Sequence, residues 1–83
     1  MSEQPERFAT AGVSTFLECF RVEPDVPFSL AFNELSVLQG CILHLTTEPE
    51  MEGDLKAGSA ARILSAMAKA LINDLEIGLN RTR

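Results

Sequence analysis

The stretch PFSLAFNELSVLQGCILHLTT, residues 27–47, decides the fold that we expect. Its apolar residues recur at alternating intervals of three and four, which is the heptad pattern of a helix lying along a partner helix. Pro27 suits the first turn of a helix, because an N–H in that turn has no acceptor within the helix. The sequence therefore predicts a helix from about Pro27 to Thr47. Its packing stripe comprises Phe28, Ala31, Leu35, Leu38, Ile42 and Leu45.

The apolar face of this helix is wider than one neighbouring helix would cover. Leu30, Val37 and Cys41 form a second stripe beside the first, and Phe32 widens the face on the opposite flank. Gly40 should cost roughly 1 kcal/mol relative to alanine in a helix, unless it permits a close helix crossing. The pattern indicates that this helix meets more than one packing partner.

A second helix is expected from about Leu55 to Leu79. The acidic linker EPEMEGD, residues 48–54, separates the two helices. Pro49 should end the first helix, and Asp54 is a good N-cap for the second. The packing stripe of this helix is spaced by threes and fours and comprises Ala60, Leu64, Met67, Leu71, Leu75 and Gly78. Its core candidates are Leu64, Met67, Leu71 and Leu75. A short linker between two long helices predicts an antiparallel hairpin.

The chain before the first helix is expected to hold a polar arm and one strand. Residues 1–14 predict a flexible arm, which leaves residues 15–83 as a single helical-hairpin domain. TFLECFRV, residues 15–22, favours a short strand, because aromatic and β-branched residues are enriched in strands. The sequence thus predicts a mainly α fold: a short N-terminal strand, then an antiparallel two-helix hairpin. Two copies should pair as a homodimeric four-helix bundle, which would bury both stripes of each helix.

Charge and hydropathy exclude several classes of partner. Twelve acidic residues against seven basic residues give a net charge of −5, which disfavours nucleic acid and anionic lipid. The longest unbroken apolar run is short, so no membrane-spanning segment is expected. The start, MSEQPER, lacks the pattern of a signal peptide, so we expect a cytoplasmic protein.

No pattern of catalytic or metal-binding residues is complete. The sequence lacks nucleophile-elbow, phosphate-loop, dinucleotide-binding and zinc-protease motifs. Asp74 and Glu76 are two residues apart on a helix, so their carboxylates should diverge. Cys41 and His44 lie one turn apart, but no third ligand completes a metal site. The acidic linker lacks the bidentate glutamate of a calcium loop. We therefore expect no enzyme activity, no cofactor and no metal.

Two stretches resemble a small, pseudomonad-type bacterial family of unknown function. These stretches are FRV with VP and FSLAFNELSVL (residues 20–38), and SAMAKALINDLE (residues 65–76). The resemblance spans roughly residues 16–79. The size and layout are also similar to a quorum-sensing anti-activator, a helical dimer that binds and blocks a LuxR-type transcription regulator. The resemblance implies a helical protein that binds a partner protein, such as a transcription regulator.

Two functions therefore stand as expectations. The first is a protein-interaction module, for which the aromatic residues Phe8, Phe16 and Phe20 are candidate partner-binding residues. In that case, deletion of residues 1–12 should weaken partner binding and leave the thermal midpoint nearly unchanged. The alternative is a protein that binds a small apolar ligand between its helices. Met67, Phe28 and Phe32 would then line the pocket.

Overall fold

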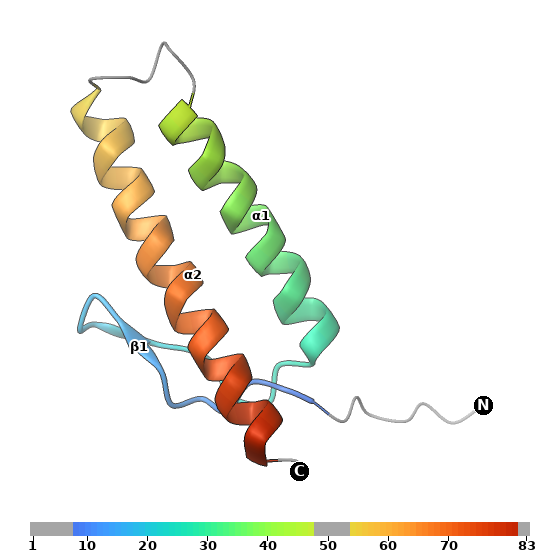
Figure 1. The fold of residues 1–83 in the computed structure, drawn as a ribbon. Coiled ribbons are helices and arrows are strands. Elements are labelled where there is room, and N and C mark those ends of the chain that lie inside the picture. Colours follow the sequence, from blue (N-terminus) through green and yellow to red (C-terminus); the bar gives the residue numbers. More distant parts are fainter. Residues whose placement is uncertain (1–7, 48–53, 82–83) are drawn as a thin grey trace.

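The computed structural model describes residues 8–47 and 54–81. Strands β1 (Thr15–Phe16) and β2 (Phe20–Arg21) precede helices α1 (Phe28–Thr47) and α2 (Leu55–Arg81). Figure 1 shows the two helices side by side and antiparallel, with the strands beside α2 on the side away from α1. The predicted mainly α fold, with an antiparallel helical hairpin after a short extended element, is confirmed.

The helix boundaries lie close to those predicted. Helix α1 begins at Phe28, and the carbonyl of Pro27 accepts a hydrogen bond from the N–H of Ala31 at 3.0 Å. The predicted N-cap of α2 is present, because Asp54 Oδ1 accepts hydrogen bonds from the N–H groups of Lys56 (2.8 Å) and Ala57 (3.2 Å). Helix α2 continues beyond the predicted Leu79 to Arg81, whose positive charge suits the negative end of the helix dipole.

The prediction of one strand over residues 15–22 is wrong in its detail. The chain reverses after Phe16, and β1 pairs antiparallel with β2 in the register Thr15↔Arg21 and Phe16↔Phe20. Leu17 and Glu18 make the reversal with φ of 54° and 58°. The rings of Phe16 and Phe20 stack with their centroids 5.2 Å apart. Periodicity could not reveal this turn, because neither Leu17 nor Glu18 favours a positive φ.

Residues 8–14 lie within the fold, a placement that the predicted arm did not include. The N–H of Phe28 donates to the carbonyl of Phe8 at 3.0 Å, and the N–H of Thr10 donates to the carbonyl of Val26 at 2.9 Å. Ala9 also forms an antiparallel bridge with Pro27. This segment therefore runs alongside the chain that leads into α1. Residues 1–7 of the predicted arm, and residues 48–53 of the acidic linker, lie outside the described residues.

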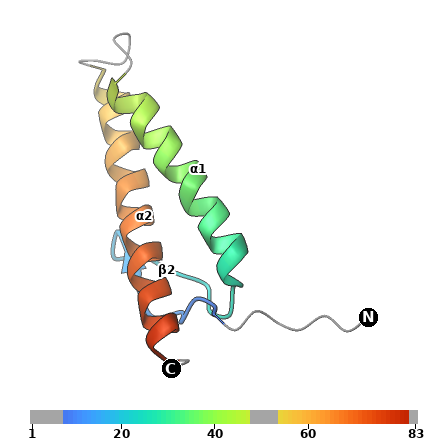
Figure 2. The ribbon, with the colours of Figure 1, turned by 45° about the vertical axis from the view of Figure 1, so that its right-hand side comes forward.

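The buried core is thin and consists mainly of small side chains. Two leucines, Leu35 and Leu75, are the only large apolar side chains that are buried among the described residues. The other buried apolar residues are alanines: Ala31, Ala57, Ala61, Ala68 and Ala70. Small side chains let the two helices approach closely near residue 54, and Figure 2 shows the helices spreading apart toward the N-terminus of α1.

The predicted stripes face the neighbouring helix only in part. Within the first stripe Ala31 and Leu35 are buried, while Phe28 is exposed. Six stripe residues from the two helices are half-buried: Leu38, Ile42, Leu45, Leu64, Met67 and Leu71. One hairpin therefore leaves much of its own packing surface open to solvent.

Candidate interaction surface

A buried carboxylate on α2 holds the N-terminal segment in place. Asp74 is 0% exposed, and its Oδ2 accepts a hydrogen bond from the N–H of Gly12 at 2.8 Å. Its Oδ1 accepts from the N–H groups of Val13 (2.8 Å) and Ser14 (2.7 Å). Consecutive backbone N–H groups of this kind form a concave site for an anion. Here the anion is part of the same chain, so the interaction is structural.

The hydrogen bonds to Asp74 stabilise its ionised form. Burial raises the pKa of this carboxyl, but hydrogen bonds from the backbone N–H groups of Ser14, Gly12, Val13 and Ala11 outweigh burial and hold the pKa below its ordinary value. Asp74 is therefore charged at neutral pH although no water reaches it.

Two glycines and a threonine complete this attachment. A Cβ at Gly78 would lie 1.9 Å from the carbonyl oxygen of Ala9, so only glycine lets the segment cross α2 at this point. Gly12 has a φ of +79°, and a Cβ there would meet Pro24. The buried hydroxyl of Thr10 donates to the carbonyl of Glu23 and accepts from the N–H of Val26 at 2.9 Å.

Sequence reasoning missed the role of these residues. Heptad spacing predicts Gly78 in the packing stripe of the second helix, and the spacing to Glu76 identifies Asp74 only as one of two diverging carboxylates. A signal exists, because Ala70, Asp74 and Gly78 are spaced four apart and share one face of α2. A buried acid between two small residues indicates a backbone that crosses the helix at that face.

An open groove runs between α1 and α2 on one side of the hairpin. Its first part has a volume of about 580 Å³ and lies toward the end of the hairpin near residue 54. Its second part lies between the start of α1 and the end of α2, and both parts are lined by Ile72. We call this surface the groove face. From α1 it includes Phe28, Phe32, Leu35, Gln39, Ile42, Leu43 and Thr46, and from α2 Ser65, Ala68, Lys69, Ile72, Leu75, Glu76 and Leu79.

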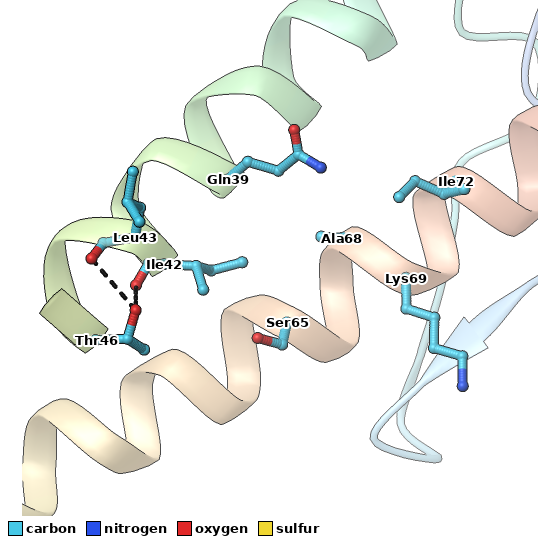
Figure 3. A pocket seen from close by; sticks show the side chains of 8 residues that line it. All are labelled: Gln39, Ile42, Leu43, Thr46, Ser65, Ala68, Lys69 and Ile72. Carbon is cyan, nitrogen blue, oxygen red and sulfur yellow. Dashed lines mark hydrogen bonds between the residues drawn. The ribbon is translucent and has the colours of Figure 1, made fainter.

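The close view in Figure 3 shows an apolar interior with a polar rim. Ile42 and Ile72 point into the space between the helices, and Ala68 lies at its base. Lys69 lines the groove, but its side chain points away from α1, so its ammonium group lies outside the interior of the groove. The hydroxyl of Thr46 is turned back to its own helix, where it donates to the carbonyl of Ile42 at 2.8 Å.

A second apolar surface lies on the part of α1 that faces away from the groove. Val37 is 60% exposed, and Leu30 and Cys41 are exposed as well. We call these three residues the outer face. A shallow hollow beside it is lined by Val37, Gly40, Cys41, His44, Leu45 and Leu64. A Cβ at Gly40 would have no neighbour within 4 Å, so packing within the described part of the chain does not explain this glycine.

The three aromatic candidates for partner binding differ in accessibility. Phe20 is 55% exposed on the strand pair, whereas Phe16 and Phe8 are half-buried. The backbone of Phe8 is tied to α1 by its hydrogen bond with Phe28. Phe20 is therefore the most accessible of the three, and a role for any of them in binding stays a prediction.

The side chains considered for metal chemistry lie apart from any third ligand. Cys41 and His44 both line the hollow beside the outer face, while Cys19 is exposed on the strand pair. Across residues 8–47 and 54–81, no group of three or more His, Cys, Asp or Glu side chains could hold a metal ion.

These features define a small helical hairpin, fastened at one end by its own N-terminal segment and open along an apolar groove. The chain belongs to the family described as protein of unknown function (DUF3077), whose family model matches residues 3–78. The match begins before the resemblance over residues 16–79 and so includes residues 8–14. No curated protein and no solved structure matches the chain.

Proposed function

We propose that the chain is a non-enzymatic protein-interaction module that pairs with a second copy and binds a further protein. One observation carries this proposal. Of the 20 residues of α1, only Ala31 and Leu35 are buried. Large apolar side chains are exposed on both the groove face and the outer face of this helix: Phe28, Phe32 and Leu43 on the first, and Leu30 and Val37 on the second. Exposed apolar patches of this kind mark interaction sites.

The composition of α1 would also suit a lipid bilayer as its partner. Among the described residues it is the one helix long and apolar enough to cross a membrane, contrary to our expectation from its short apolar runs. A helix that packs within or between protein chains meets the same criteria. Because α1 lies along α2 and carries Glu34, we assign its apolar surface to protein partners.

The finer form of the proposal is an anti-activator that binds and inhibits a transcription regulator. It is supported by the similarity in size and layout to a quorum-sensing anti-activator. Pairing through one apolar face of α1 would leave the other face, together with Phe20, for the regulator. Binding of the purified chain to a LuxR-type regulator, measured by calorimetry, tests this form directly.

The groove favours one alternative, a protein that binds a small apolar ligand. Its first part, about 580 Å³, falls within the range of about 300–1,000 Å³ that is common for ligand pockets. Phe28 and Phe32 line the second part as predicted for this alternative, but Met67 lines neither part. A ligand that stays bound in native mass spectrometry of the purified chain would support this function.

Sedimentation equilibrium between 1 and 100 µM tests the pairing, and capture from a native lysate tests the further partner. The double variant Leu30→Ser/Val37→Ser removes apolar surface from the outer face and should lose a captured partner. The variant Ser36→Ala, which removes only a hydroxyl group from the same helix, is the control. A chain that stays monomeric and captures nothing that depends on Leu30 and Val37 would contradict the proposal.

A further inference from the structure

We infer that the groove face is the surface on which the second copy docks, with each α2 antiparallel to the partner's α2 and the two-fold axis at Ile72–Asn73. This inference rests on the proposed function, since it specifies how two copies pair. It also leaves the outer face of α1 free for the further protein.

This two-fold symmetry places opposite charges from the two copies next to each other along the groove. Lys69 and Glu76 both lie on α2 and both line the groove. Ile72 and Asn73 stand midway between them. A two-fold axis through this level places each Lys69 beside the partner's Glu76, because in a symmetric interface residue i meets residue j and j meets i. Within the described residues neither side chain has an ion pair of its own.

The apolar residues of α1 obey the same symmetry. Phe32 is 49% exposed and Leu43 is 62% exposed, and both line the groove. Their midpoint in sequence falls between Val37 and Leu38, which is also the middle of α1. An axis at this level places each Phe32 against the partner's Leu43.

The two midpoints lie at the same height along the hairpin. Leu35 shares one part of the groove with Ile72 and Leu75. On the other side of that level, Ile42 shares the groove with Ala68. A single axis between the two hairpins can therefore pass both helices at their midpoints. It pairs the opposite charges on α2 and the apolar side chains on α1 at once.

The available area reaches the lower limit of what stable interfaces bury. Phe28, Phe32, Leu43 and Ile72 are between 37% and 62% exposed. Together they offer about 400 Å² of apolar surface, since a large side chain presents roughly 200 Å². Interfaces between identical chains are about 65% apolar, which corresponds to an interface of about 600 Å² per chain. Stable interfaces bury about 600–1,000 Å² on each partner.

Local complementarity is also required because the copies repel each other overall. Each chain carries a net charge of −5, so two chains approach against a long-range repulsion. The groove face places a lysine and a glutamate of each chain where the partner offers the opposite sign. A small apolar ligand in the groove would leave both rim charges unpaired.

Charge reversal tests the inference on the full chain. Lys69→Glu converts two attractive pairs of the dimer into repulsive ones and should raise the dimer dissociation constant about tenfold, given the modest energy of exposed ion pairs. Glu76→Lys should have a similar effect. The double variant Lys69→Glu/Glu76→Lys restores opposite signs across the axis and should recover the original affinity. Lys56→Glu is the matched control, because Lys56 lies on α2 but does not line the groove.

Disulfide trapping provides a second measurement that does not depend on charge. In a chain with Cys19→Ser and Cys41→Ser, the variant Ile72→Cys should form a covalent dimer under mild oxidation. Ser65→Cys, which lines the groove far from the axis, should not.

The outcomes separate this inference from the proposed function. A dimer that is insensitive to both charge reversals and does not cross-link at Ile72→Cys overturns the inference, while self-pairing stands. Weakening by the single reversals without recovery in the double variant also overturns the antiparallel register. A chain that is monomeric at 100 µM removes the self-pairing on which the inference rests.

Discussion

A buried carboxylate with no basic partner would destabilise most proteins, and at the scale of single residues Asp74 avoids that cost through backbone N–H groups. Gly12, Val13 and Ser14 donate to its two oxygens at 2.7–2.8 Å. Hydrogen bonds to a charged acceptor are shorter and stronger than neutral ones. One side chain therefore satisfies several backbone donors of a segment about 60 residues away in sequence.

Asp74→Asn should lower the free energy of unfolding by about 3 kcal/mol. The amide keeps one acceptor oxygen but turns an NH₂ group toward backbone donors, which leaves buried donors unsatisfied. Urea unfolding at one fixed chain concentration measures the change. Glu34→Gln, which removes the same charge from an exposed position, is the control and should change stability by less than about 0.5 kcal/mol.

The contribution of Asp74 to stability should depend on pH in a defined direction. The pKa of Asp74 is lowered in the folded state, so its contribution is fully present above the unfolded-state value of about 3.9. It is lost as the pH falls through the lower folded-state value. The difference in stability between the wild type and Asp74→Asn should thus be constant from pH 5 to 7 and shrink below about pH 4. A difference that grows on acidification would contradict this assignment.

Substitution of two glycines of α2 by alanine should change the stability of the protein in opposite directions. Gly78→Ala places a Cβ against the carbonyl of Ala9 and should destabilise the protein by about 1–3 kcal/mol, because the backbone segment must move. A Cβ at Gly58 meets nothing within 4 Å, so Gly58→Ala should stabilise it by about 0.5–1 kcal/mol. Thermal unfolding measures whether each variant is less or more stable than the wild type. Equal effects would mean that helix propensity alone decides at these positions.

At the scale of elements, the N-terminal segment is a packing element although it is neither helix nor strand. Residues 8–14 lie between the chain that enters α1 and the C-terminal part of α2, and hydrogen bonds join them to both. The strand pair β1–β2 continues from this segment and contacts α2 through β1. The segment therefore braces the wide end of the hairpin, where the helices stand apart (Figure 2).

Because residues 8–14 pack within the fold, their deletion should lower the thermal midpoint, whereas the sequence alone predicted that it would stay nearly unchanged. Deletion of residues 1–14 removes the donors to Asp74 and the partners of Val26 and Phe28, and should lower the thermal midpoint by more than about 10 °C. Deletion of residues 1–7 leaves every contact described for residues 8–14 and is the matched control. A midpoint that stays within a few degrees after the longer deletion would show that the segment adds little to stability.

At the scale of the whole molecule, the thin alanine-rich core leaves stability dependent on what covers the open surfaces. A single hairpin with two large buried leucines among its described residues offers little apolar burial, and small domains commonly need such support from oligomerisation. Pairing through the groove face would convert a two-helix layer into the predicted four-helix bundle.

If pairing supplies part of the stability, the thermal midpoint should depend on chain concentration. Mass action favours the folded dimer, so each tenfold increase in concentration should raise the midpoint by about 3–5 °C. Calorimetric scans between 5 and 500 µM measure this slope. The variant Lys69→Glu should have a lower midpoint than the wild type at every concentration. A midpoint independent of concentration would contradict coupling of folding to pairing.

The sequence by itself determined the two helices, the N-cap at Asp54 and the surplus of apolar residues on α1. Heptad spacing and capping are local rules, so they can be applied without knowledge of distant residues. The tertiary structure decided that residues 8–14 lie on α2, that the chain reverses at Leu17 and Glu18, and that Asp74 is buried. These features depend on contacts between segments far apart in sequence, and a polar segment gives no periodic signal of where its backbone donors will find acceptors.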